Sequence, residues 1–210
     1  MSGCFITFEG VEGCGKSTQI ALLWEYLTEA GYDVIVTREP GGTPIAEAIR
    51  GVLLNPDHEN MGPAVELLLY AAARAQHVFE KIAPALAAGQ IVLCDRFADS
   101  TTAYQGAGRG LHAELLHTLN EIATGGVWPD CTLLIDVPVT VGLERARSRG
   151  RKDRIEQESI DFHERVRQGF LSLAASDHDR IHLIPGEASV DEVHQTIRRA
   201  VEALLAARVE

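Results

Sequence analysis

Eight residues near the start of the chain, Gly10 to Ser17, read Gly-Val-Glu-Gly-Cys-Gly-Lys-Ser and stand between an apolar run, 4–8, and a helix-like segment, 16–30. Glycines at these positions allow a tight turn in which successive backbone N–H groups point inward, and the following helix adds the positive end of its dipole. Such a loop holds phosphate oxygens with the main chain. The spacing therefore predicts a strand, a phosphate-binding loop and a helix, and a chain that binds a nucleoside triphosphate.

The polar side chains of this loop have separate expected roles. Lys16 can reach the β- and γ-phosphates as a point charge, while the hydroxyl of Ser17 is placed to ligate Mg²⁺. Thr18 adds a further hydroxyl at the start of the helix. The predicted triphosphate-binding residues are Gly10, Val11, Glu12, Gly13, Cys14, Gly15, Lys16, Ser17 and Thr18.

Apolar runs and helix-period stretches alternate along the chain. The apolar runs are nearly continuous, as in strands that are covered on both faces, and they span residues 4–8, 33–37, 90–94, 131–136 and 181–184. The helix-period stretches span residues 16–30, 64–88, 111–124, 140–149, 157–176 and 189–207. This alternation predicts one α/β domain over residues 1–210, with a mostly parallel sheet that binds its ligands beyond the carboxyl ends of the strands.

The overall charge and composition limit the partners of this chain. A net charge of −11 disfavours a nucleic-acid or acidic-membrane surface, because repulsion acts over the whole molecule. No apolar run approaches the ~20 residues that span a bilayer, and we expect no secretory leader. The four cysteines are scattered singly, as reduced thiols are. We therefore expect a cytoplasmic protein that holds anionic ligands through a local cluster of basic residues.

The eight histidines show no metal-ligand spacing, so we expect no zinc site. Three of them, His77, His163 and His194, fall in helix-period stretches and are expected at the surface.

Two aspartates end apolar runs and are candidate metal ligands. Asp95 follows the run 90–94, where a carboxylate can complete a Mg²⁺ shell directly or through water, although an Asp at a strand end can also cap the next segment. Asp136 competes for the same role but stands before Val137 and Pro138, away from other candidate ligands. We therefore favour Ser17 and Asp95 as the metal ligands.

The arginines indicate which kind of triphosphate enzyme this is. Arg38, Arg74 and Arg96 lie in or near predicted strand ends and helices, and further arginines cluster in a basic loop at 148–154. A hydrolase binds one polyanion, whereas a nucleotide kinase brings two phosphate groups together and must neutralise their repulsion. Guanidinium suits this task because it stays charged and grips phosphate oxygens bidentately. This number of arginines therefore favours a nucleotide kinase over a hydrolase.

Several further segments carry a resemblance over nearly the whole chain. They are 8–13, 37–43 (Thr-Arg-Glu-Pro-Gly-Gly-Thr), 70–74 (Tyr-Ala-Ala-Ala-Arg), 95–97 (Asp-Arg-Phe), 100–106 (Ser-Thr-Thr-Ala-Tyr-Gln-Gly) and 153–156 (Asp-Arg-Ile-Glu). In these segments the chain resembles the bacterial thymidylate kinases, a family of P-loop nucleoside monophosphate kinases. The resemblance implies phosphorylation of dTMP to dTDP with ATP and Mg²⁺. It also implies a three-layer α/β/α P-loop kinase fold with a five-stranded parallel sheet and a short mobile lid at about 147–157.

The same resemblance implies roles for individual side chains in the acceptor site. Arg96 matches the arginine on the acceptor phosphate, Tyr70 the ring that stacks on thymine, and Arg74 the arginine that contacts the base. Glu12 matches the carboxylate that accepts from the 3′-hydroxyl, and Tyr104 the tyrosine beneath the deoxyribose. The implied substrate-binding residues are Glu12, Arg38, Pro40, Tyr70, Arg74, Arg96, Thr101, Tyr104 and Gln105.

A lid arginine is also implied. Family members without an arginine in the phosphate-binding loop supply one from the lid, and this loop reads Glu-Gly-Cys at 12–14. The basic loop fits this role, with Arg149 and Arg154 favoured and Arg151 harder to align. The implied catalytic residues are Lys16, Asp95, Arg96, Arg149 and Arg154.

The implied partners are dTMP and ATP as small molecules and a second copy of the chain in a homodimer. The stretches 64–88 and 111–124 are possible contact faces, although an apolar helix face more often packs into a core.

Three other functions share the phosphate-binding loop. One is a nucleotide-binding module without catalysis, which would tolerate loss of Lys16, Asp95 or Arg96, and all three are present. A kinase for another nucleoside monophosphate remains the alternative, and only the pocket residues Tyr70, Arg74, Thr101 and Tyr104 speak against it. A GTPase-type switch should carry an Asn/Thr-Lys-x-Asp motif after a strand, and the sequence has none.

Overall fold

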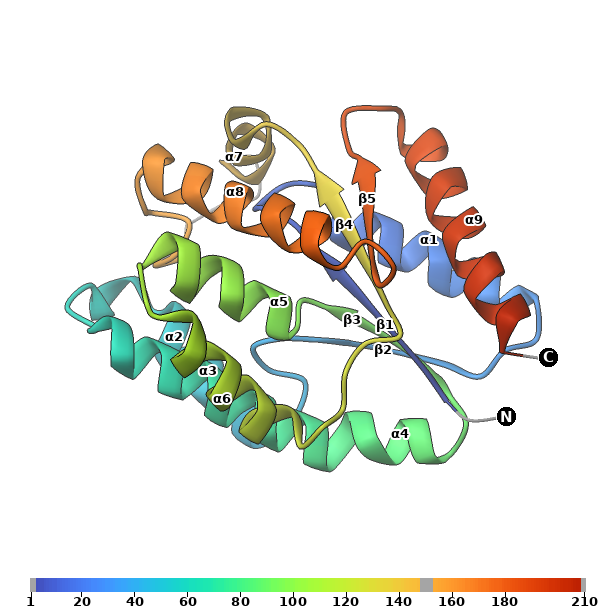
Figure 1. Cartoon of the computed structure of the whole chain (residues 1–210), viewed down its shortest axis with the longest axis horizontal. Helices are drawn as coiled ribbons and strands as arrows, with labels where there is room; N and C mark the ends of the chain where they lie inside the picture. Colours follow the sequence, from blue (N-terminus) through green and yellow to red (C-terminus); the bar gives the residue numbers. More distant parts are fainter. Residues whose placement is uncertain (1–2, 148–152, 209–210) are drawn as a thin grey trace.

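A parallel sheet of five strands lies at the centre of residues 3–147 and 153–208, the part of the chain that this computed structural model describes (Figure 1). The strand order is β2-β3-β1-β4-β5, and every neighbouring pair is parallel. The strands are β1 (Cys4–Glu9), β2 (Val34–Arg38), β3 (Ile91–Asp95), β4 (Cys131–Asp136) and β5 (Ile181–Pro185). This confirms the predicted five-stranded parallel sheet, and its carboxyl ends meet at one edge.

Helices cover both faces of the sheet, which makes the fold a three-layer α/β/α arrangement (Figure 1). The helices are α1 (Lys16–Glu29), α2 (Pro44–Leu54), α3 (Pro63–His77), α4 (Ala83–Ala87), α5 (Ala98–Thr101), α6 (Ala113–Thr124), α7 (Val139–Arg147), α8 (Ile160–Ser176) and α9 (Val190–Ala207). Short helical turns are the 3₁₀ turn η1 (Pro56–His58) and the π-helical turns η2 (Val78–Ile82) and η3 (Thr102–Gly108).

Successive side chains of the central strand enter different cores. Ile6 packs with residues of α1 and α9, including Leu23 and Ile197. Phe5 points to the opposite face and packs with Ile82 and Phe97. Each such side chain, when fully buried, contributes on the order of 2 kcal/mol. Burial on both faces is why the strands read as continuous apolar runs rather than as alternating ones.

Three helical segments differ from the sequence prediction. The stretch expected as one helix over 64–88 runs through α3, the π-helical turn η2 and α4. Both α2 and the helical segment 98–108 were not predicted. The second of these has the composition of a loop, rich in Gly, Ser and Thr, and is helical because it packs against α8 and α6. The helix propensity of these residues therefore could not predict the segment.

Residues 148–152 of the predicted lid lie outside the described part of the chain, so Arg149 and Arg151 are not placed. Among the helices that are described, none combines the length and the apolar character needed to cross a lipid bilayer.

Candidate active site

The phosphate-binding loop joins β1 to α1 and depends on its glycines. Gly10, Gly13 and Gly15 have φ angles of 133°, 69° and 105°, a region that favours glycine. A Cβ on Gly13 would collide with the carbonyl oxygen of Gly142, and one on Gly10 would collide with that of Ile135. No side chain caps the start of α1, so its first N–H groups are available to an anion.

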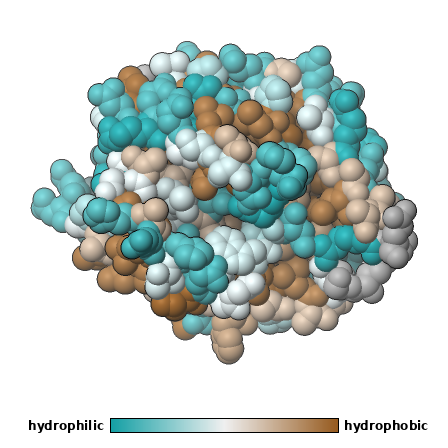
Figure 2. Space-filling view, in the orientation of Figure 1, coloured by the Kyte–Doolittle hydropathy of each residue, from teal (hydrophilic) through white to brown (hydrophobic). Residues whose placement is uncertain are grey.

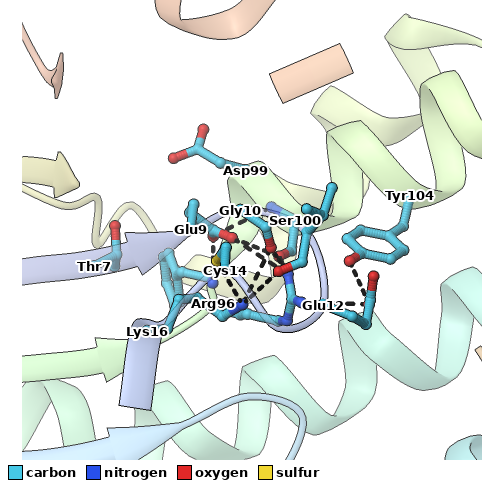
Figure 3. Close-up of polar contacts among 12 residues, drawn as sticks. Thr7, Glu9, Gly10, Glu12, Cys14, Lys16, Arg96, Asp99, Ser100 and Tyr104 are labelled. Carbon is cyan, nitrogen blue, oxygen red and sulfur yellow. Dashed lines mark hydrogen bonds and ion pairs between the residues drawn. The ribbon is translucent and has the colours of Figure 1, made fainter. Parts of the chain in front are cut away.

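Lys16 is the first residue of α1, and its side chain is buried against the phosphate-binding loop. Its ammonium group donates to the carbonyl oxygens of Gly10 and Val11, at 3.2 Å each, and lies 3.5 Å from the sulfur of Cys14 (Figure 3). The positive charge is therefore held where the loop turns toward α1, as expected for a group that meets the triphosphate.

Asp95 ends β3 next to β1, and its side chain lines a cleft together with Ser17. Its Oδ1 atom is buried and has no hydrogen-bond partner among the described residues. A carboxylate oxygen and a hydroxyl suit Mg²⁺, which keeps several waters and phosphate oxygens in its shell. In the described ranges, no group of three or more His, Cys, Asp or Glu side chains could hold a metal ion. Asp95 and Ser17 therefore fit a Mg²⁺ ion that takes its other ligands from water and from the phosphates of a bound nucleotide.

Asp136, the competing carboxylate, has a different environment. Both of its oxygens accept from the guanidinium of Arg167, at 2.7 and 2.8 Å. This bidentate pair neutralises the charge that a metal would need, so the structure favours Asp95 over Asp136.

Arg96 connects the end of β3 to the phosphate-binding loop. Its φ angle of 71° is rare for a residue with a side chain, and it aims the guanidinium back at the loop. The guanidinium donates to the carbonyl oxygen of Gly10 at 2.8 Å and to the hydroxyl of Ser100 at 3.2 Å (Figure 3). It also lies over the ring of Tyr104, 5.0 Å from the centroid. Arg96 is thus fixed between the phosphate-binding loop and the helical segment 98–108.

Glu9 is a fully buried carboxylate that holds the segment after β3. It accepts from the backbone N–H of Phe97 at 2.7 Å and from the hydroxyl of Ser100 at 2.6 Å. Burial raises the pKa of Glu9 to about 7. Sequence reasoning assigned no role to Glu9 or Ser100, although both stand in segments that carry the family resemblance.

Glu12 points from the loop toward η3 and α8. The hydroxyl of Tyr104 donates to its Oε1 at 2.5 Å, and the guanidinium of Arg96 lies 3.4 Å from the same oxygen (Figure 3). The ring of His163 lies 3.2 Å from Oε2. Burial raises the pKa of Glu12, but these three neighbours outweigh it and lower the pKa to about 2. Glu12 is therefore a carboxylate at physiological pH.

All of the substrate-binding residues implied by the resemblance line the same cleft as loop residues 12–17. They include Tyr70 and Arg74 from α3 and Thr101 and Gln105 from the segment 98–108. Arg38, at the end of β2, is half exposed and pairs with Glu47 at 2.9 Å. Folding therefore brings together residues that are spread over the first half of the chain.

Arg74 is almost fully buried, with all of its nitrogens engaged. Nε donates to Glu39 at 2.8 Å, Nη1 to Thr101 at 2.9 Å and to Asn120 at 3.0 Å, and Nη2 to the carbonyl oxygen of Phe97 at 3.0 Å. These four contacts hold the guanidinium in one orientation.

Two histidines expected at the surface are buried. His77 joins Glu39, at 3.0 Å from Nδ1, to the hydroxyl of Thr37, at 2.7 Å from Nε2. His163 is likewise fully buried. His77 comes three residues after Arg74, and this helical spacing places both on the core face of α3. The spacing to Arg74 could therefore have indicated from the sequence that His77 is buried.

Arg154, an implied lid residue, is buried with α3. Its Nε donates to the carbonyl oxygen of Leu53 at 2.8 Å, and its Nη2 lies 2.6 Å from the carboxylate of Glu66. Glu66 also accepts from Gln105 at 2.8 Å and from Arg109 at 3.0 Å. In this arrangement Arg154 anchors the segment that follows the basic loop. Glu66 and Arg109 were not anticipated from the sequence.

Comparison with known proteins agrees with this geometry. The family model described as Thymidylate kinase matches residues 8–197. A thymidylate kinase of Geotalea uraniireducens is 56% identical, over 97% of this chain and 99% of the relative. One from Geobacter sulfurreducens is 55% identical, over 97% of each chain. The crystal structure of thymidylate kinase from Ehrlichia chaffeensis matches with a TM-score of 0.79 at 36% identity, covering 96% of this chain and 99% of that one. Since the match extends over nearly the full length in both sequence and structure, the chain belongs to the thymidylate kinase family.

Proposed function

We propose that the reaction of this family, transfer of the γ-phosphoryl group of ATP to dTMP, takes place in the cleft between the phosphate-binding loop and the segment after β3. One observation carries this proposal: the loop residues 12–17 and the acceptor residues Tyr70, Arg74 and Tyr104 line one continuous cleft. Two nucleotides can therefore meet there with their phosphates facing each other, as in-line transfer requires.

On the donor side, the backbone N–H groups of the loop and the Lys16 ammonium hold the triphosphate. Ser17 and Asp95 would hold Mg²⁺, which neutralises charge on the phosphate oxygens when it is bound. The buried, unpartnered Oδ1 of Asp95 supports this assignment.

On the acceptor side, Arg96 holds the dTMP phosphate beside the loop, since its guanidinium already lies at the carbonyl oxygen of Gly10. The acceptor phosphate is a nucleophile at neutral pH, so the protein needs only to position it and to neutralise charge. Tyr70 offers a ring face for thymine, and Arg74, which lines the same cleft, is the residue that we place in contact with the base. Glu12 accepts from the 3′-hydroxyl of the deoxyribose.

The lid completes the site in this proposal. Arg149, together with Arg154 once it leaves Glu66, supplies positive charge to the transferring group only after water is excluded. The chain offers no arginine in the phosphate-binding loop that could do so instead.

A homodimer and a cytoplasmic location belong to the same proposal. Exposed apolar side chains lie on α3, η2 and α6; they are Val65, Leu68, Phe79, Leu115 and Ile122. Figure 2 shows hydrophobic surface along the lower left of the molecule, where Figure 1 places α3 and α6. A second copy that covers this patch would remove it from water. The free, buried thiols of Cys4, Cys14, Cys94 and Cys131 suit a reducing compartment.

The test is ADP release by the purified chain with ATP, Mg²⁺ and one nucleoside monophosphate at a time. We expect turnover with dTMP well above that with dUMP, UMP, CMP or AMP, and Lys16→Ala should abolish it. Higher turnover with another monophosphate would support the alternative kinase. Equal ADP release without any acceptor would contradict the whole proposal.

A further inference from the structure

His163 is a buried titratable group next to the acceptor site, and the reaction described above gives it no task. It lies in α8, its side chain is fully buried, and neither ring nitrogen makes a hydrogen bond within the described residues. Its Nδ1 atom lies 3.2 Å from Oε2 of Glu12. A buried imidazole is costly unless a polar neighbour uses it, and Glu12 is that neighbour.

The two oxygens of Glu12 have different surroundings. Oε1 receives the hydroxyl of Tyr104 at 2.5 Å and faces the guanidinium of Arg96 at 3.4 Å. Oε2 is buried, has no hydrogen-bond partner among the described side chains and lies 3.2 Å from Nδ1 of His163. The side chain keeps 10% of its surface exposed and lines the cleft. The carboxylate is therefore held on one oxygen and approached by the imidazole on the other.

We propose that His163 is a positioning residue for the acceptor nucleotide, which fixes the carboxylate of Glu12 so that it accepts a hydrogen bond from the sugar hydroxyl. This inference rests on the proposed role of Glu12 in the acceptor site. The 3.2 Å between Nδ1 and Oε2 is already within hydrogen-bonding distance, so a small rotation of the imidazole ring is enough for Nδ1–H to donate to Oε2. The carboxylate then cannot rotate about its last bond, and a lone pair stays directed at the cleft.

A purely structural role for His163 makes a different prediction. The ring also packs edge-on against Phe162, with centroids 5.4 Å apart, and truncation of a packing residue lowers stability without regard to the ligand. A positioning residue instead affects only those ligands that carry the hydroxyl. The two roles are therefore separated by a pair of acceptors that differ in this one group.

The experiment compares dTMP with 3′-deoxythymidine monophosphate, at saturating ATP, in the full chain. His163→Leu keeps the apolar volume and removes the donor, and we expect the KM for dTMP to rise about 10-fold with little change in kcat, while the KM for the 3′-deoxy acceptor stays the same. His163→Asn places an amide N–H near the position of Nδ1 and should retain most of the preference for dTMP. In the background of Glu12→Gln, His163→Leu should have no further effect on this preference.

Thermal unfolding of each variant shows whether it folds. If His163→Leu does not fold, the comparison of His163→Asn with His163→Gln replaces it, because the Gln amide reaches the position of Nε2 rather than Nδ1, and only Gln should lose the preference. Equal effects on both acceptors, or no effect on either, would overturn the inference. Wild-type protein that is inactive with dTMP would instead overturn the proposed function.

Discussion

The guanidinium of Arg154 lies 2.6 Å from a carboxylate oxygen of Glu66, and both side chains are buried. Gln105 and Arg109 donate to the same carboxylate, which therefore joins α3, η3 and the segment that precedes α8. For Arg154 to reach a phosphate, it must give up this contact. The pair thus stabilises the position of Arg154 seen here, and the proposed catalytic role of Arg154 requires that a phosphate contact replace it.

Removal of the Glu66 carboxylate should be costly for stability. Glu66→Ala leaves two arginines near one another without their shared partner, and we expect the free energy of unfolding to fall by about 3–5 kcal/mol. Urea denaturation measures this change. Glu80→Ala, which removes an exposed partner of Gln76 one helical turn away, is the control and should leave the midpoint unchanged. Equal midpoints for the two variants would show that Glu66 contributes nothing.

Replacement of Arg96 should act on turnover. Arg96→Ala removes the group that we place on the acceptor phosphate, and one such arginine contributes on the order of 10³ in kcat. Arg96→Lys should recover only a small part, since an ammonium cannot span the Gly10 carbonyl oxygen and a phosphate as a guanidinium does. ADP release with dTMP measures both variants, with the exposed Arg198→Ala as control. Normal turnover by Arg96→Ala would contradict the assignment.

A methyl group on Gly13 should prevent nucleotide binding. Its Cβ would collide with the carbonyl oxygen of Gly142, and its φ angle of 69° adds strain. Gly31→Ala is a matched control, because its φ angle of 87° is also positive but its Cβ would meet nothing within 4 Å. We expect the control to lose about 1 kcal/mol of stability and to keep its affinity for ATP. Calorimetric titration with ATP should detect no binding by Gly13→Ala.

The raised pKa of Glu9 should make the free energy of unfolding depend on pH. Burial raises its pKa to about 7 from 4.5, so between these values the folded chain keeps a proton that the unfolded chain has lost. The unfolded state then binds fewer protons, and the free energy of unfolding falls as the pH rises. Relative to Glu9→Gln, which does not titrate, the wild type should lose about 2–3 kcal/mol between pH 5 and pH 8. A constant difference between the two proteins across this range would contradict the raised pKa.

The apolar patch on α3, η2 and α6 should control assembly. Phe79 and Ile122 are 77% and 70% exposed, and a charge at either position would have to be buried in the proposed homodimer. Ile122→Glu should therefore shift the chain toward the monomer in sedimentation velocity. Leu183→Glu introduces the same charge at an exposed position on β5 and should not. A wild-type monomer at micromolar concentration would contradict the homodimer.

Most of the fold could be predicted because its signals are local. Each of the five strands is an apolar run, and the loop from Gly10 to Ser17 follows the first of them directly. The helical segment 98–108 could not be predicted, because its Gly, Ser and Thr residues favour a loop and only contacts with α6 and α8 make it helical. Burial of His77 could have been inferred from its spacing to Arg74, whereas nothing in the sequence around His163 indicated its carboxylate neighbour.

The amino-acid sequence by itself determines that a phosphate-binding loop follows a buried strand. The glycines that allow the turn and the apolar residues of the strand lie within a few positions of one another, so no distant contact is needed to specify them. Only the tertiary structure decides the pKa values of the carboxyl groups in the site. Glu12 is ionised because Tyr104, Arg96 and His163 converge on it from distant parts of the chain, and the pKa of Glu9 is raised because the sheet and its helices exclude water. These properties depend on distances between residues far apart in sequence, and such distances exist only once the layers have packed.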